Sequence, residues 1–124
     1  MIVRRLMLLG ILLLGGCHAH PQSQAAIDIG DGLILQVANN NWSDVVIYTV
    51  RDGTRTRFVV ATAATSTTVP FPLRFVNSSG TIQLVAHRIG GTDEYVSPVV
   101  SVRMGHTIAL TLESNLVRST VGVW

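Results

Sequence analysis

The 124-residue chain contains no lysine and a single cysteine, and only 13% of its residues are charged. One thiol cannot close an intrachain disulfide, so core packing alone must stabilise the fold. The cysteine is Cys17, so the chain after it carries no thiol for nucleophilic catalysis or for a thiolate metal site. Hydrophobic residues make up 48% of the chain, which excludes a disordered polar tail.

The positive charge of the chain does not indicate a nucleic-acid partner. Nine arginines against seven acids give a net charge of +2, and two of these arginines, Arg4 and Arg5, lie at the N-terminus. Beyond them, seven arginines balance seven acids. A neutral domain has no basic surface of the kind that binds phosphate backbones, so we expect no nucleic-acid partner.

The first residues have the pattern of a secretory signal peptide. Two arginines lie in residues 1–5, residues 6–14 are apolar apart from one glycine, and two glycines precede Cys17. The apolar run is much shorter than the roughly 20 residues that a transmembrane helix needs. We therefore predict that residues 1–16 form a signal peptide that is removed.

The stretch Leu14-Gly15-Gly16-Cys17 closely resembles the lipobox of bacterial lipoproteins, and this resemblance covers residues 1–17 only. It implies that the Cys17 thiol receives a diacylglyceryl group, that signal peptidase II cuts between Gly16 and Cys17, and that the new amino group is acylated too. Because each buried methylene contributes about 0.8 kcal/mol, two or three acyl chains hold a protein on a membrane stably. His18 replaces the aspartate that favours inner-membrane retention, so an outer-membrane location is favoured in a bacterium with two membranes.

Residues 17–31 are predicted to be the lipidated cysteine and a flexible tether. Residues 18–30 are polar, contain a proline and show no sustained period. At about 3.3 Å per residue they could hold a domain about 40 Å from the lipid surface. His18 and His20 could bind a metal weakly, but two ligands without a third do not make a zinc site, and a polar linker is favoured.

The remaining residues, 32–124, are predicted to form one domain of short strands. Runs rich in Val, Ile, Thr and Leu alternate with Gly, Asn, Asp and Pro, and no long helical pattern occurs. Asp52-Gly53 predicts a tight hairpin, and Pro98 is expected to interrupt its strand. The predicted strands cover residues 33–38, 44–51, 55–62, 66–70, 81–88, 95–103, 106–113 and 116–123.

Alternation of apolar and polar residues predicts which side chains form the core. Seven or eight such strands favour an all-β fold with a single antiparallel β-sandwich. The architecture resembles immunoglobulin-like or transthyretin-like sandwiches, but it lacks the Cys and Trp spacing of immunoglobulin domains. The predicted core residues are Leu33, Leu35, Val37, Val45, Ile47, Ile82, Leu84, Ala86, Ile108, Leu110 and Leu112.

No pattern in the sequence indicates an enzyme, a cofactor or a metal site. There is no G-x-S-x-G stretch and no phosphate-binding loop. Asp93 and Glu94 are adjacent, and adjacent residues of an extended chain point to opposite faces. His87 and His106 could meet across a sheet, but they are expected to be an exposed strand residue and a turn residue.

Binding is the more credible role, and two groups of residues are candidates. Asn41 and Trp42 lie in a polar loop, where the indole could stack on a sugar or anchor a protein contact, or could instead fold back and cap the core. Arg51, Arg55 and Arg57 flank the hairpin and could meet an acidic partner, or could simply be solvated. We expect a non-catalytic interaction or structural module of the cell envelope that uses loops or a strand edge, or alternatively a glycan-binding module.

Overall fold

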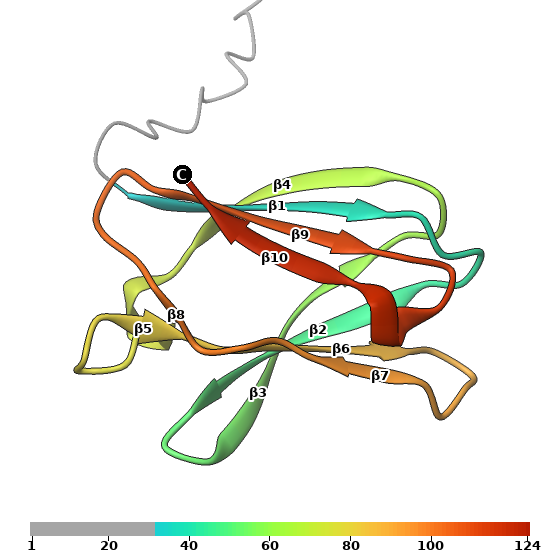
Figure 1. Ribbon diagram of the computed structural model, residues 1–124, viewed down its shortest axis with the longest axis horizontal. Helices are drawn as coiled ribbons and strands as arrows, with labels where there is room; N and C mark the ends of the chain where they lie inside the picture. The colour runs from blue at the N-terminus through green and yellow to red at the C-terminus, as the bar shows by residue number, and fades with distance from the viewer. Residues whose placement is uncertain (1–31) are drawn as a thin grey trace, which may run out of the picture.

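The computed structural model describes residues 32–124, which form ten short strands and two short 3₁₀ helices (Figure 1). The predictions for Gly16, Cys17, the tether and its two histidines lie outside the described residues. The strands are β1 (Leu33–Asn39), β2 (Val45–Arg51), β3 (Thr54–Ala61), β4 (Ser66–Phe71), β5 (Thr81–Ile82), β6 (Leu84–Arg88), β7 (Glu94–Val96), β8 (Val100–Ser101), β9 (Thr107–Leu112) and β10 (Thr120–Val123). The 3₁₀ helices are η1 (Leu73–Phe75) and η2 (Leu116–Arg118).

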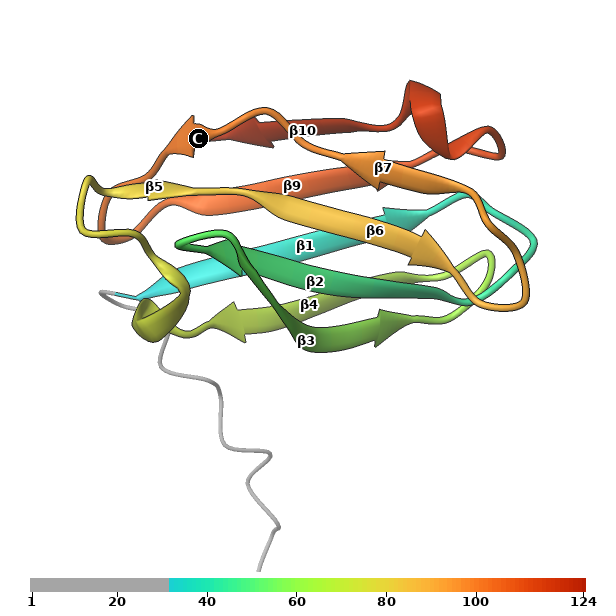
Figure 2. The same cartoon turned by 90° about the horizontal axis from the view of Figure 1, so that it is seen from below.

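The strands are arranged in two facing four-stranded sheets, so the predicted all-β sandwich is confirmed. The first sheet has the order β10-β9-β1-β4 and the second has the order β3-β2-β6-β7. Figure 2 shows the sheets one behind the other, with β3 and β4 along one side and β7 and β10 along the other. A third pairing joins β5 to β8.

One pairing differs from the antiparallel expectation, because β1 and β9 run parallel in register from Ile34↔Thr107 to Asn39↔Leu112. A parallel pair requires a long connection, and here all the chain between β1 and β9 supplies it. Alternation of apolar residues shows which face of a strand is buried. It does not show the direction of the neighbouring strand, so this pair could not be predicted.

Three of the predicted strands are broken in the structure. The chain changes sheets at Gln83, since β5 pairs with β8 while β6 pairs with β2 and β7. Residues 97–99, which include Pro98, separate β7 from β8, as expected of a residue that cannot donate to a ladder. The last predicted strand begins instead with η2, where the Asn115 side chain accepts a hydrogen bond from the Val117 amide at 3.2 Å.

The predicted hairpin is confirmed between β2 and β3. Asp52 and Gly53 have φ angles of 51° and 76°, the two positive values that a type I′ turn requires. The core prediction is also confirmed, since all eleven predicted side chains are buried. The prediction succeeds because apolar residues alternate strictly, as in β9, where Ile108, Leu110 and Leu112 are 0 to 1% exposed.

A β-bulge allows a phenylalanine cluster to close one end of the sandwich. Ile47 pairs with Val59 and Tyr48 pairs with Arg57, so Phe58 is the extra residue of β3. The Phe58 ring packs edge-on against Phe71 and Phe75 with centroids 5.5 and 5.4 Å away. Figure 2 shows η1, which carries Phe75, at the end of the sandwich opposite to the connection between β1 and β2.

Candidate functional site

Four connections meet at the other end of the sandwich, which we call the loop end (Figure 1). They are residues 40–44 between β1 and β2, residues 62–65 between β3 and β4, residues 89–93 between β6 and β7, and residues 113–119 between β9 and β10. Hydrogen bonds from side chains join these connections to one another. The loop end is therefore built from segments that lie far apart in the sequence.

Asn39 is the first of the two amides that hold the loop end together. It ends β1, it is 1% exposed, and its Nδ2 donates to the carbonyl oxygens of Ser43, Ala61 and Thr62 at 3.1 to 3.2 Å. Its Oδ1 accepts from the Asn41 amide at 3.0 Å. A buried carbonyl without a hydrogen-bond donor is unfavourable, so these carbonyls stay close to the Asn39 amide. One side chain therefore fixes both the β1–β2 loop and the β3–β4 turn.

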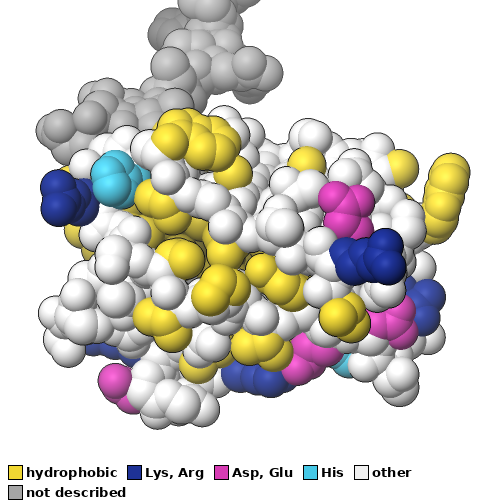
Figure 3. Space-filling view, in the orientation of Figure 1, with side chains coloured by type: hydrophobic (Ala, Val, Ile, Leu, Met, Phe, Trp, Pro, Cys, Tyr) yellow, Lys and Arg dark blue, Asp and Glu magenta, His cyan; other side chains and the backbone are white. Residues whose placement is uncertain are grey.

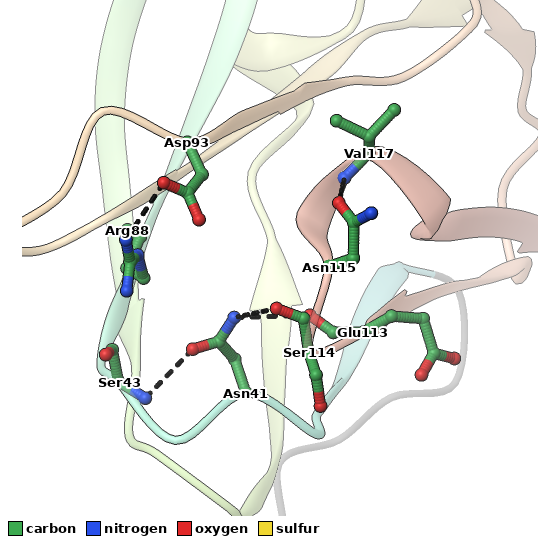
Figure 4. A network of polar contacts seen from close by, with 8 residues as sticks. All are labelled: Asn41, Ser43, Arg88, Asp93, Glu113, Ser114, Asn115 and Val117. Carbon is green, nitrogen blue, oxygen red and sulfur yellow. Dashed lines mark hydrogen bonds and ion pairs between the residues drawn. The ribbon is translucent and has the colours of Figure 1, made fainter.

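Asn41 is the second amide, and it extends the same network to the β9–β10 connection. Its Nδ2 donates to the carbonyl oxygens of Glu113 and Ser114 at 3.2 and 3.1 Å, and its Oδ1 accepts from the Ser43 amide at 3.0 Å (Figure 4). Its own carbonyl accepts from the Ala64 amide at 3.1 Å. The residue is 4% exposed, so the predicted binding role of Asn41 becomes that of a positioning residue.

Asp44 joins the β3–β4 and β6–β7 connections to the β1–β2 loop. Its Oδ1 accepts from the Ala63 amide at 2.9 Å, and its carbonyl accepts from the Ile89 amide at 2.9 Å. The turn that contains Ile89 is held in addition by an ion pair between Arg88 and Asp93 at 2.9 Å (Figure 4). The other three connections are thus tied to the β1–β2 loop.

Trp42 projects into solvent from this network. It lies between Asn41 and Ser43, whose backbone amides are both held by asparagine side chains, yet Trp42 itself is 86% exposed. The alternative in which the indole folds back to cap the core is therefore wrong. A second apolar side chain at the loop end, Val117, is 74% exposed.

A shallow depression of about 490 Å³ lies beside these residues and is lined by Glu113, Ser114, Asn115 and Arg118. Its lining offers a carboxylate, a hydroxyl, an amide and a guanidinium, so it can both donate and accept hydrogen bonds. The Ser114 hydroxyl also donates to the Asn40 carbonyl at 3.3 Å. The depression and the Trp42 loop are therefore parts of one connected surface.

No pattern in the sequence predicts this depression. Its residues follow Asn41 by more than 70 positions, and no period or motif links the two segments. The signal that was available is the run of three asparagines at 39–41. Polar side chains directly after an apolar strand satisfy the carbonyls of neighbouring loops, and here two of the three do so.

The predicted arginines near the hairpin have different partners in the structure. Arg55 on β3 forms a bidentate ion pair with Glu94 on β7, with both N–O distances at 2.9 Å. Since β3 and β7 are opposite edges of the second sheet, this pair spans the outer face of that sheet. Among residues 32–124 no ion pair involves Arg57, whereas Arg51 approaches Asp52, so Arg57 is the predicted arginine that stays available for an acidic partner.

Glu94 also approaches His87, whose Nδ1 lies 3.4 Å from Oε2 of Glu94. The hydrogen bond from Arg55 lowers the pKa of the Glu94 carboxyl, and the same contact raises the pKa of Arg55. His106 is not part of this cluster, because its Nδ1 accepts from the Arg103 amide at 3.1 Å before β9. His87 lies in β6 and His106 in the turn before β9, and no hydrogen bond or ion pair joins them.

No known protein family, curated protein or solved structure matches this chain. Within residues 32–124, no three His, Cys, Asp or Glu side chains are grouped closely enough to hold a metal ion. In the same range, no helix is long and apolar enough to cross a membrane.

Proposed function

We propose that this chain is a bacterial lipoprotein, held on a membrane by lipid on Cys17, whose β-sandwich is a non-catalytic interaction module of the cell envelope. The lipobox-like stretch that ends at Cys17 supports the anchor. In a bacterium with two membranes, His18 directly after the cysteine favours the outer membrane. The loop end supports the interaction, with Trp42 as its central contact.

The observation that carries the proposal is the 86% exposure of Trp42 on a loop held by buried amides. Burial of a large aromatic side chain against a partner is favourable, because it removes apolar surface from water. Binding costs less when the contact residue is held by ordered neighbours, since little conformational entropy remains to be lost. Tryptophan is also among the residues that most often dominate protein interfaces.

Co-purification with matched variants tests the interaction. The full-length protein is extracted from membranes in mild detergent as wild type, as Trp42→Ala and as Val99→Ala, since Val99 is 60% exposed but lies away from the loop end. We expect one envelope protein to accompany the wild type and Val99→Ala and to be lost with Trp42→Ala. Equal recovery with Trp42→Ala, or no envelope protein with any form, would contradict the proposal.

A separate experiment tests the lipid anchor. Cys17→Ala removes the acceptor thiol, so we expect unprocessed precursor and the loss of globomycin-sensitive processing. The Cys17→Ala protein should also lack incorporated palmitate. If precursor size, membrane fractionation and globomycin sensitivity stay unchanged, the anchor is not at Cys17.

A glycan is the second candidate ligand, and the polar depression beside Trp42 favours it. Sugar recognition combines an aromatic platform with hydrogen-bonding groups, and Glu113, Asn115 and Arg118 supply such groups. Titration with muropeptides tests it in a Trp124→Phe background, where Trp42 is the only tryptophan in the sequence and its fluorescence can be followed alone. A shift or quench of the emission supports glycan binding, and an unchanged spectrum up to millimolar ligand rejects it.

A further inference from the structure

The four outer strands of the two sheets differ in how well their edges are protected against pairing. Strand β4 contains Pro70, which has no N–H to offer, and β7 is only three residues long. Strand β3 is bulged at Phe58 and carries Arg55 and Arg57. Strand β10, with the sequence Thr-Val-Gly-Val, has no proline, no charge and no bulge.

The hydrogen-bond pattern shows which groups of β10 face outward. Trp124 and Thr107 exchange both backbone hydrogen bonds, at 2.9 and 3.2 Å, so they form a hydrogen-bonded pair. In an antiparallel ladder such pairs alternate, which directs the N–H and C=O groups of Val121 and Val123 away from β9. Within residues 32–124 these groups have no hydrogen-bond partner.

Gly122 lies between these two valines, and nothing in residues 32–124 requires a glycine at this position. Its φ is not positive, the register of β10 with β9 is regular, and a Cβ added there would meet nothing within 4 Å. Glycine weakens a strand and often marks a place where another backbone approaches closely. At Gly122 no other part of residues 32–124 makes that approach.

We propose that β10 pairs with β10 of a second copy of this chain, antiparallel about a twofold axis at Gly122. Val121 then forms a hydrogen-bonded pair with Val123 of the second copy, and the symmetric pair repeats on the other side of the axis. The two glycines face each other as a non-hydrogen-bonded pair, where Cα atoms lie only about 4.5 Å apart. The two first sheets become one continuous sheet.

A second copy fits this edge better than an arbitrary strand for two reasons. The pattern of outward groups is symmetric about Gly122, so the strand is complementary to itself, and it brings no like charges together. The pairing also places Trp124, which is 66% exposed on the outer face, opposite Thr120 of the second copy. Exposed apolar side chains between the sheets on the face shown in Figure 3 adjoin this edge.

Disulfide cross-linking tests the register. The full-length protein is purified in detergent as wild type, Gly122→Cys and Thr68→Cys; Thr68 is an exposed residue of β4, the opposite edge of the same sheet. We expect mild oxidation to convert most of Gly122→Cys to a dimer on a non-reducing gel, while Thr68→Cys stays monomeric. The wild type reports any cross-link through Cys17. Equal cross-linking of the two variants, or none with Gly122→Cys, would overturn the proposal.

Sedimentation tests the association without a cross-link. Gly122→Lys places two ammonium groups at the axis, and the open space above Gly122 allows the side chain without distorting the fold. We expect the wild type and Thr68→Lys to sediment as dimers and Gly122→Lys as a monomer, with unchanged circular dichroism. A wild type that is monomeric throughout the micromolar range would refute the pairing.

Discussion

The two ends of the sandwich are closed in opposite ways. At one end, Phe58, Phe71 and Phe75 pack their rings edge to face, and Arg74 lies 4.6 Å above the Phe75 ring. At the loop end, the buried side chains of Asn39 and Asn41 hold the connections through backbone carbonyls. One end is sealed by apolar contact and the other by directional hydrogen bonds.

This difference bears on the proposed binding role of the loop end. Apolar packing turns the three phenylalanine rings inward and away from water. The amides of the loop end instead fix the backbone and leave the neighbouring side chain, Trp42, free to project. The polar end therefore combines a fixed backbone with an exposed aromatic group, which is the combination that a binding surface needs.

The largest effect on stability is expected at the phenylalanine end. Phe71 is 3% exposed and contacts both other rings, so Phe71→Ala leaves a cavity and should lower the free energy of unfolding by about 3 to 5 kcal/mol. Denaturant unfolding followed by circular dichroism measures this loss. Phe71→Leu, which keeps most of the volume, should lose clearly less. Equal losses would show that the ring packing has no special role.

A smaller loss is expected at the loop end. Asn39→Ala leaves three backbone carbonyls without their donor and should cost about 1 to 3 kcal/mol. Hydrogen exchange of the Asn41 and Ala64 amides should accelerate at the same time, because both depend on this network. Asn115→Ala, which removes only an exposed cap, serves as the control. Unchanged exchange in Asn39→Ala would show that the loops hold without the amide.

The ion pair between Arg55 and Glu94 belongs to neither end and should contribute less. Glu94→Gln is expected to lower the free energy of unfolding by less than about 1 kcal/mol at pH 7, since the pair is partly solvated. The folded-state pKa of Glu94 is lowered, so this contribution is present above its ordinary value of 4.5. It disappears as the pH falls through the folded-state pKa. A difference that persists at pH 2 would assign the effect to packing.

The smallest effect on stability is expected at Trp42. An 86% exposed side chain contributes little to folding, so Trp42→Ala should change the free energy of unfolding by at most about 0.5 kcal/mol. Thermal unfolding of the two proteins measures it. A loss of several kcal/mol would mean that Trp42 supports the fold, and the contrast between the two ends would then fail.

The sequence predicts the parts of this fold that depend on local pattern. Alternation in β9 identifies its buried face, and Asp52-Gly53 identifies the hairpin. The parallel pairing of β1 with β9 and the bulge at Phe58 could not be predicted, because both depend on strands that are distant in the chain. The same limit applies to the short pair of strands β5 and β8, because the periodicity does not separate these strands from their neighbours in the chain.

At the candidate site, the sequence identifies which residues matter, but it does not show whether each of them is exposed, buried or paired. Trp42 and Asn41 were both identified as candidates, but one is exposed and the other is buried. Arg55 and Arg57 look equivalent in the sequence, although only Arg55 reaches Glu94. Such roles depend on what lies across the sheet or across the loop end, and these neighbours are set by the folded topology.

Photo-cross-linking in intact cells is the most direct test of whether the loop end presents Trp42 to an envelope partner. Benzoylphenylalanine is placed at position 42 and, as a control, at the exposed position 52 in the β2–β3 hairpin. We expect a cross-linked envelope component at position 42 that is absent at position 52 and weakened by Asn39→Ala. The same products from both positions, or none from position 42, would contradict it.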